Sequence, residues 1–183
     1  MRRHFRQITG VLLSAAIVLC CCSIARAEML PSIRVFAPSD IRAGETFTAR
    51  VAVKLPASVS YSALAVTLVW DASRLEPVGE PNISQEIFSA NKDKLFDVML
   101  LSHNDTKKGL TEIALGNWKD AKISEDAGEV TVAAQKFKVK EITGATSIEF
   151  TNDSTKTNNG TLCFSGTQEV DFRLFTPVRI NIK

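Results

Sequence analysis

The stretch TFTARVAVK at residues 46–54 shows how the rest of the chain is built. Phe47, Ala49, Val51 and Val53 occupy every second position, and most of the positions between them are polar or charged. A period of two is typical of a β-strand with one buried face, because successive side chains of a strand point to opposite sides. We therefore predict a strand here, with its four apolar side chains in a core.

The same alternation recurs along the chain, with turn-forming residues such as Asn104-Asp105 between the runs. Only residues 84–94 could form a helix, and no helix is long enough to connect two parallel strands. About nine short strands separated by regular turns indicate an antiparallel β-sandwich, an all-β fold. Besides 46–54, the predicted strands are 63–70, 95–101, 110–117, 128–140, 146–151, 170–174 and 178–182.

The first 27 residues indicate a secretory signal. Arg2, Arg3 and Arg6 precede an apolar stretch at 8–24, and Ala25-Arg26-Ala27 forms a small-x-small cleavage site. We predict cleavage of residues 1–27, a single domain over residues 28–183, and no transmembrane segment after cleavage. The exported domain would be extracellular or periplasmic.

Two other fates of this N-terminal segment stay open. It could be retained as a membrane anchor, although its apolar run is short for crossing a bilayer. The exported domain could also carry a lipid anchor on one of the cysteines at 20–22, which is less favoured than simple cleavage. No small residue precedes Cys20 or Cys22, as it would at a lipidation site.

Composition and charge exclude several classes of protein. The chain has 183 residues, of which 45% are apolar and 7% aromatic, so it is not disordered, collagen-like or wholly embedded in a membrane. Cleavage would remove four arginines from 22 basic residues and leave 18, against 20 acidic ones. Lys136, Lys138 and Lys140 alternate with apolar residues, which indicates one solvated strand face. With no Lys/Arg stripe that interleaves with aromatic residues, the sequence argues against a nucleic-acid partner.

Catalytic and metal-binding signatures are weak. Residues 28–183 contain one histidine, His103, and one cysteine, Cys163, too few for a catalytic triad or a zinc site. Cys163 lies between Leu162 and Phe164, where a buried position is expected. The polar stretch 152–159 could offer oxygens to calcium, but a polar hairpin is the better interpretation. We therefore expect no enzymatic activity, no cofactor and no resident metal.

Four segments, in this order, resemble cohesin domains. Two departures from the family pattern are Trp70, where a tyrosine is usual, and Ala72, where a proline is usual. The likeness runs from about residue 33 to residue 182. The segments are AGETFTARVAV (43–53), AVTLVWDASRLE (65–76), LFDV (95–98), and ISEDAGEV (123–130) followed by FKVK (137–140).

This resemblance implies a nine-stranded jelly-roll sandwich related to carbohydrate-binding modules. It also implies a non-catalytic module that holds a dockerin on one flat sheet face. Dockerins are small calcium-loaded modules that carry enzymes, so any calcium would belong to the partner. A role in polysaccharide breakdown would follow.

Alternation places a candidate partner-binding face on three of the predicted strands. The residues predicted to point inward on these strands include Leu68, Phe96, Val98, Leu100 and Ile113. Successive side chains of a strand point to opposite sides, so the residues between the inward ones would point outward. A loop or terminal segment could still cover this face. The candidate residues are Thr67, Val69, Asp97, Met99, Leu101, Glu112 and Ala114.

Two alternative functions stay open. A carbohydrate-binding module would need exposed aromatic residues, for which Trp118 is the best candidate, ahead of Tyr61 and Trp70. The chain could also be a structural subunit of a surface or secretion assembly.

Overall fold

A computed structural model of the chain describes residues 30–56, 60–88, 95–122, 128–151, 160–175 and 177–183. Residues 31–183 form one compact unit. The predicted signal and its cleavage site lie outside the described residues. Within the described part of the chain, no helix has the length and apolar character that crossing a bilayer requires.

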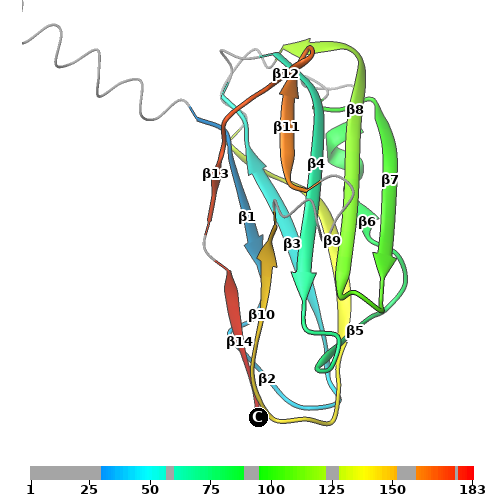
Figure 1. Cartoon of the computed structure of the whole chain (residues 1–183), viewed down its shortest axis with the longest axis vertical. Coiled ribbons are helices and arrows are strands. Elements are labelled where there is room, and N and C mark those ends of the chain that lie inside the picture. Colours follow the sequence, from blue (N-terminus) through cyan, green and yellow to red (C-terminus); the bar gives the residue numbers. More distant parts are fainter. Residues whose placement is uncertain (1–29, 57–59, 89–94, 123–127, 152–159, 176) are drawn as a thin grey trace, which may run out of the picture. The chain divides into compact units, whose positions relative to one another are not determined.

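The compact unit is a sandwich of two β-sheets (Figure 1). The first sheet has the order β13-β1-β3-β9-β5, and β6 also pairs with β9. Its strands are β1 (Ser32–Phe36), β3 (Thr46–Lys54), β5 (Leu75–Pro77), β6 (Asn82–Ile83), β9 (Glu129–Val139) and β13 (Arg173–Leu174).

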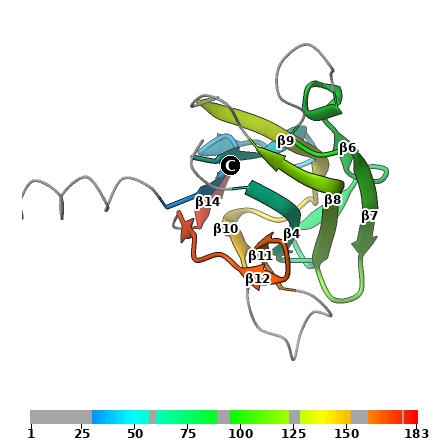
Figure 2. The same cartoon turned by 90° about the horizontal axis from the view of Figure 1, so that it is seen from above.

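The second sheet has the order β12-β11-β4-β10-β14-β2, with β8 paired to β4 and β7 paired to β8. Seen along the strands in Figure 2, β9 lies in one layer and β4, β10 and β11 lie in the other. The strands are β2 (Asp40–Ile41), β4 (Ser60–Trp70), β7 (Val98–Asp105), β8 (Leu110–Lys122), β10 (Gly144–Phe150), β11 (Leu162–Ser165), β12 (Gln168–Glu169) and β14 (Val178–Ile182).

These sheets confirm the predicted antiparallel sandwich. Neighbouring strands are antiparallel except for the short pairs β1–β13 and β14–β2, which are parallel. The strand predicted at 46–54 coincides with β3, and the strand predicted at 178–182 coincides with β14.

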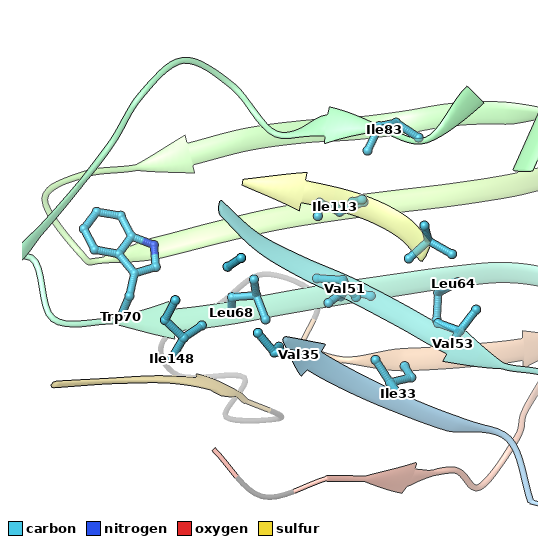
Figure 3. Close-up of a cluster of buried hydrophobic side chains, with 14 of the residues drawn as sticks. Ile33, Val35, Val51, Val53, Leu64, Leu68, Trp70, Ile83, Ile113 and Ile148 are labelled. Carbon is cyan, nitrogen blue, oxygen red and sulfur yellow. The ribbon is translucent and has the colours of Figure 1, made fainter. Parts of the chain in front are cut away.

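The core lies between the sheets, where the alternating apolar registers meet (Figure 3). Val51 and Val53 of β3 face Leu64 and Leu68 of β4, and all four are buried. Trp70 closes one end of this core with its ring 5.4 Å from that of Phe137. The side chains that the alternation in residues 46–54 and 64–70 predicted to point inward are therefore buried, as expected.

A chain of polar side chains connects the two sheets beside Trp70. Trp70 Nε1 donates to Thr111 Oγ1 (3.1 Å), which donates to Asn104 Oδ1 (2.6 Å). Asn104 Nδ2 in turn donates to Gln135 Oε1 across the sandwich (3.0 Å). Gln135 is 2% exposed, so these bonds replace the water that its amide loses on burial.

Several local expectations were wrong. Strand β1 was not expected, and β7 begins at Val98 rather than at residue 95. The strand predicted at 170–174 is reduced to β13, because residues 170–172 take no part in a sheet. The possible helix at 84–94 is a short 3₁₀ helix, η1 (Gln85–Phe88), as far as the structure describes it. Strand β11 was not expected, since the turn residues around 158–160 had indicated only a loop.

Candidate protein-docking face

The outer side of the second sheet joins residues from β7, β8, β4 and β11. Residues directly opposite each other on paired strands share one face of the sheet. Ala63 of β4 lies opposite Gly116 of β8, and Ala65 lies opposite Ala114. On the other side of β4 lies β11 (Figure 1), whose Leu162 and Phe164 lie opposite Ala65 and Ala63. On the other side of β8, Leu101 of β7 lies opposite Ala114 and Val98 lies opposite Gly116.

The middle of this surface is made of small residues, and larger apolar side chains lie on both sides of it. A Cβ atom added to Gly116 would lie 3.1 Å from Leu100 Cδ1 and 3.6 Å from Val98 Cγ1. Both side chains therefore extend over Gly116, on the outer side of the sheet. Leu100 is nevertheless 62% exposed. We call this surface the docking face, comprising Ala63, Ala65, Val98, Leu100, Leu101, Ala114, Gly116, Leu162 and Phe164.

A β-bulge in β7 corrects the expected orientation of Leu100 and Met99. The register of β7 with β8 shifts between Met99, which lies opposite Leu115, and Leu101, which lies opposite Ala114. A bulge adds one residue to a strand, so the alternation of side chains changes phase there. Leu100, expected inward, is exposed on the docking face. Met99 is 50% exposed, in agreement with the outward position predicted for it, but it lies opposite Leu115 and so on the other side of the strand from the docking face. Met99 shares the side of the buried Leu115 and lines a cavity with neighbours that include Ile83 and Phe88.

Thr67 was also predicted on the exposed face, and this prediction is wrong. Its side chain is on the outer side, but the residue is only 1% exposed. Thr67 Oγ1 donates to the carbonyl of Gly160 (2.8 Å), and its amide donates to Thr161 Oγ1 (3.1 Å). Residues 160–161 therefore cover the sheet here, as the alternative of a covering segment anticipated.

Of the other predicted residues, Leu101, Ala114 and Glu112 lie together in neighbouring cross-strand pairs, and all are half-buried. Val69 is half-buried as well, but it lies farther along β4, opposite Leu110. Asp97 is exposed one residue before β7, and its amide donates to the carbonyl of Gly116 (3.0 Å). The structure thus brings three of the seven predicted residues into one cluster.

Glu112 carries a polar atom that the fold leaves unsatisfied. Its Oε1 is buried and has no hydrogen-bond partner among the described residues. The residues opposite it in the sheet are Thr67 and His103. A buried acceptor without a donor is costly, so a donor supplied from outside would stabilise this position.

Trp118 lies at one end of the docking face and is 82% exposed. It follows Gly116 by two residues on β8, where the register with β4 shifts: Gly116 lies opposite Ala63, and the next pair joins Ala121 to Tyr61. Asn117, between them, points inward and donates to the carbonyls of Tyr61 (2.8 Å) and Leu95 (3.0 Å). Tyr61 and Trp70, the other aromatic candidates, are buried.

Several residues of the docking face were missed by sequence reasoning. Val98 and Leu100 were assigned inward because the bulge has no signature in the sequence. Leu162 and Phe164 were missed because β11 was not expected. Their alternation around Cys163 was the available signal, and Cys163 is buried as predicted.

Comparisons with known proteins identify the fold of this domain. No protein-family model matches the sequence, and the search of curated proteins found no relative. Solved structures do match. A type II cohesin domain from the cellulosome of Acetivibrio cellulolyticus is 21% identical with a TM-score of 0.60, over 83% of this chain and 95% of that one. The chain has the cohesin fold.

Two further cohesin structures agree with this assignment of the fold. The seventh ScaB type I cohesin of Pseudobacteroides cellulosolvens is 14% identical with a TM-score of 0.58, covering 84% of this chain and 92% of its own. The third ScaC cohesin of A. cellulolyticus, solved in complex with the ScaB dockerin, is 17% identical with a TM-score of 0.62. That match covers 84% of this chain and 99% of the cohesin.

The described residues give little support for a metal site or for a reactive cysteine. Among the described residues, no three or more His, Cys, Asp or Glu side chains gather closely enough to hold a metal ion. Burial raises the pKa of the Cys163 thiol to about 12, which makes it a poor nucleophile near neutral pH. The polar stretch 152–159 lies outside the described residues.

Proposed function

We propose that this domain is a non-catalytic docking module that holds a dockerin-like protein partner on the docking face. The observation that carries the proposal is the apolar outer side of β7, β8, β4 and β11, with Leu100 and Trp118 exposed. Clustered exposed apolar side chains favour a protein-interaction site. Proteins of similar fold support the kind of partner, since the ScaC cohesin and a cohesin of Clostridium thermocellum were solved in complex with dockerins.

The shape of the face suits a partner that packs closely against the sheet. Ala63, Ala65, Ala114 and Gly116 have little or no side chain, so the backbone of a partner helix could come near the strands. Leu100 and Phe164 would then pack against the flanks of that helix. Affinity at such interfaces resides mainly in a few central apolar or aromatic anchors.

Charge would set the orientation of the partner. Glu112, with its buried unsatisfied Oε1, lies beside this apolar centre, and Asp97 is exposed at its margin. A partner that presents lysine, arginine or hydroxyl donors here would satisfy Glu112 and pair with Asp97. Charged groups at the edge of an interface contribute to register and association rate more than to affinity.

The proposal extends to location and biological setting. The arginine-led apolar segment at 1–27 supports export to an extracellular or periplasmic compartment. A dockerin-like partner would bring an enzyme with it, and we propose polysaccharide breakdown as the setting. Calcium would be bound by the partner.

Adjacent residues of the β7 bulge provide a matched test. Leu100→Arg places a charge in the docking face, whereas Met99→Arg places the same charge on the other side of the strand. In pull-downs from the exported proteins of the source, we expect Leu100→Arg to recover at least about tenfold less partner than wild type. Met99→Arg should recover as much as wild type, and a calcium chelator should release the partner. Equal recovery by Leu100→Arg, or a greater loss with Met99→Arg, would rule out this face.

Trp118 keeps a second candidate function open, because its exposed indole could stack on a sugar ring. Tyr61 and Trp70 are buried, so Trp118 would act without either of the other two candidates. Retardation of the protein by a neutral glucan in affinity electrophoresis, abolished by Trp118→Ala, would favour this function over protein docking.

A further inference from the structure

The outer side of the first sheet gathers cations from strands that are far apart in the sequence. Alternation turns Arg34 of β1, Arg50 of β3, and Lys136 and Lys138 of β9 to this side. Arg34 is half-buried and the other three are exposed. The lysines had been expected to form only a solvated strand face. Strand β9 lies next to β3, and β3 lies next to β1 (Figure 1), so the lysines become part of a larger basic surface.

The pairing register arranges these cations along a diagonal line. Arg34 lies opposite Ala52, and Arg50 is two residues from Ala52 on β3. Lys136 lies opposite Thr48, which is two residues beyond Arg50. Each step moves one strand across, about 4.8 Å, and two residues along, about 6.7 Å, so successive cations are about 8 Å apart at the backbone. Lys138 continues the line along β9. We call Arg34, Arg50, Lys136 and Lys138 the cationic track.

Two phenylalanine rings hold the arginine end of the track. The guanidinium carbon of Arg34 lies 4.0 Å from the ring centroid of Phe175 and 5.6 Å from that of Phe36. The guanidinium carbon of Arg50 lies 5.9 Å from the Phe36 ring. Such contacts restrain the side chains and leave planar N–H donors for a carboxylate or sulfate.

Acidic residues lie at the two ends of the track. Glu129 Oε1 is 3.8 Å from Arg34 Nε, and Glu76 lies opposite Lys138. Within the described part of the chain, neither Arg50 nor Lys136, at the middle, forms an ion pair. The middle therefore keeps its positive potential, although residues 28–183 carry more acidic than basic side chains.

We propose that the cationic track binds an extended polyanion, an acidic polysaccharide with carboxylate or sulfate groups. Evenly spaced cations in a line match charges repeated along a chain better than they match a planar lipid surface. None of the exposed large apolar side chains that the structure describes belongs to β1, β3 or β9, so these strands offer little to insert into a membrane. Arg34 already packs against the rings of Phe36 and Phe175, which disfavours the base stacking that single-stranded nucleic acids use. This proposed binding site is separate from the docking function, because the cationic track lies on the first sheet and the docking face lies on the second.

Affinity electrophoresis through gels that contain polygalacturonate tests the proposal. The double variant Arg50→Glu/Lys136→Glu should bind at least about tenfold more weakly than wild type, and binding should weaken strongly from about 50 to about 500 mM NaCl. The control is Lys107→Glu/Lys108→Glu, which changes the net charge equally in the exposed turn between β7 and β8. It should stay within about threefold of wild type, since it leaves the track intact.

Two further arms make the test decisive. The neutralised variant Arg50→Gln/Lys136→Gln should also lose binding, and circular dichroism of all variants checks that the loss is not unfolding. Single-stranded DNA and vesicles containing phosphatidylglycerol serve as competing probes. Absence of retardation by polygalacturonate, equal losses in the track and control variants, or tighter binding to DNA or vesicles would each overturn the proposal. Leu100→Arg should leave polygalacturonate binding unchanged, so a failure of the docking proposal would be seen separately.

Discussion

Gly109 is the residue whose replacement the backbone should tolerate least. Its φ is +67°, in the left-handed region that favours glycine. A Cβ atom there would lie 2.2 Å from the carbonyl oxygen of Trp70, and the Trp70 amide donates to the Gly109 carbonyl (2.9 Å). The turn before β8 therefore lies in direct contact with the end of β4.

Gly109→Ala should lower the free energy of unfolding by about 2–4 kcal/mol, because backbone strain and the close contact with Trp70 add together. Gly128→Ala is the matched control, with a φ of +71° and no atom of the described residues within 4 Å of the added Cβ. It should cost only about 1 kcal/mol, since only the backbone preference is lost. Urea unfolding measures both, and equal losses would contradict a steric role for Trp70.

The bulge at Leu100 shows how much one residue can change. A single additional residue in β7 moves Leu100 to the docking face and Met99 to the side of Leu115. Nothing in the sequence around these positions distinguishes a bulge from a regular strand, because both residues are apolar and unbranched at Cβ.

At the scale of elements, β7 and β9 are joined across the sandwich by polar side chains. Besides accepting from Asn104, Gln135 donates through Nε2 to the carbonyls of Lys136 (2.6 Å) and Gly79 (3.2 Å). Gln135 therefore links β9 to β7 and to the segment between β5 and β6.

Gln135→Leu should destabilise the fold by about 1–3 kcal/mol, because it removes the three hydrogen bonds that the Gln135 amide makes with Asn104, Gly79 and Lys136. Thr48→Ala, an exposed position on neighbouring β3, should change stability by no more than about 0.5 kcal/mol. Thermal or urea unfolding gives both values. A neutral effect of Gln135→Leu would mean that packing, rather than these hydrogen bonds, joins the elements.

At the scale of the whole molecule, Cys163 reports on opening of the sandwich. It lies opposite Leu64 on the inner side of β11, is 1% exposed, and has a pKa raised to about 12 by burial. Its thiol is therefore protonated and inaccessible as long as the two sheets stay together.

On a chain that starts at residue 28, Cys163 should react with a thiol reagent at pH 8 at least about a thousandfold more slowly than in denaturant. If reaction requires opening, the rate should rise with pH only up to the pKa of an unfolded thiol, about 8.5, and then level off. A rate that keeps rising toward pH 12 would show reaction from the closed state. Fast labelling at pH 8 without denaturant would contradict the burial of β11.

The two sheets also present surfaces of different character. The outer side of the second sheet is mainly apolar, with Leu100 and Trp118 exposed. The outer side of the first sheet carries the cationic track. In a two-layer sandwich the outer sides face away from each other, so a protein partner and a polyanion could be bound at the same time.

The sequence by itself determined which side of each regular strand is buried. In β3 and β4 the apolar register alone predicted the core, including Val51, Val53, Leu64 and Leu68. The physical reason is local: successive side chains alternate, and only one side of a sheet in a sandwich can leave water. The burial of Trp70 followed from the same rule.

Only the tertiary structure decided which strands lie side by side and in which register. The covering of Thr67 by residues 160–161, the bulge opposite Ala114, and the line from Arg34 to Lys136 all depend on such pairings. These contacts join residues far apart in the chain, and their register is set by hydrogen bonds between backbones that all residues share. Side-chain order along one strand therefore carries little information about them, and both proposed surfaces could be defined only after the strands were paired.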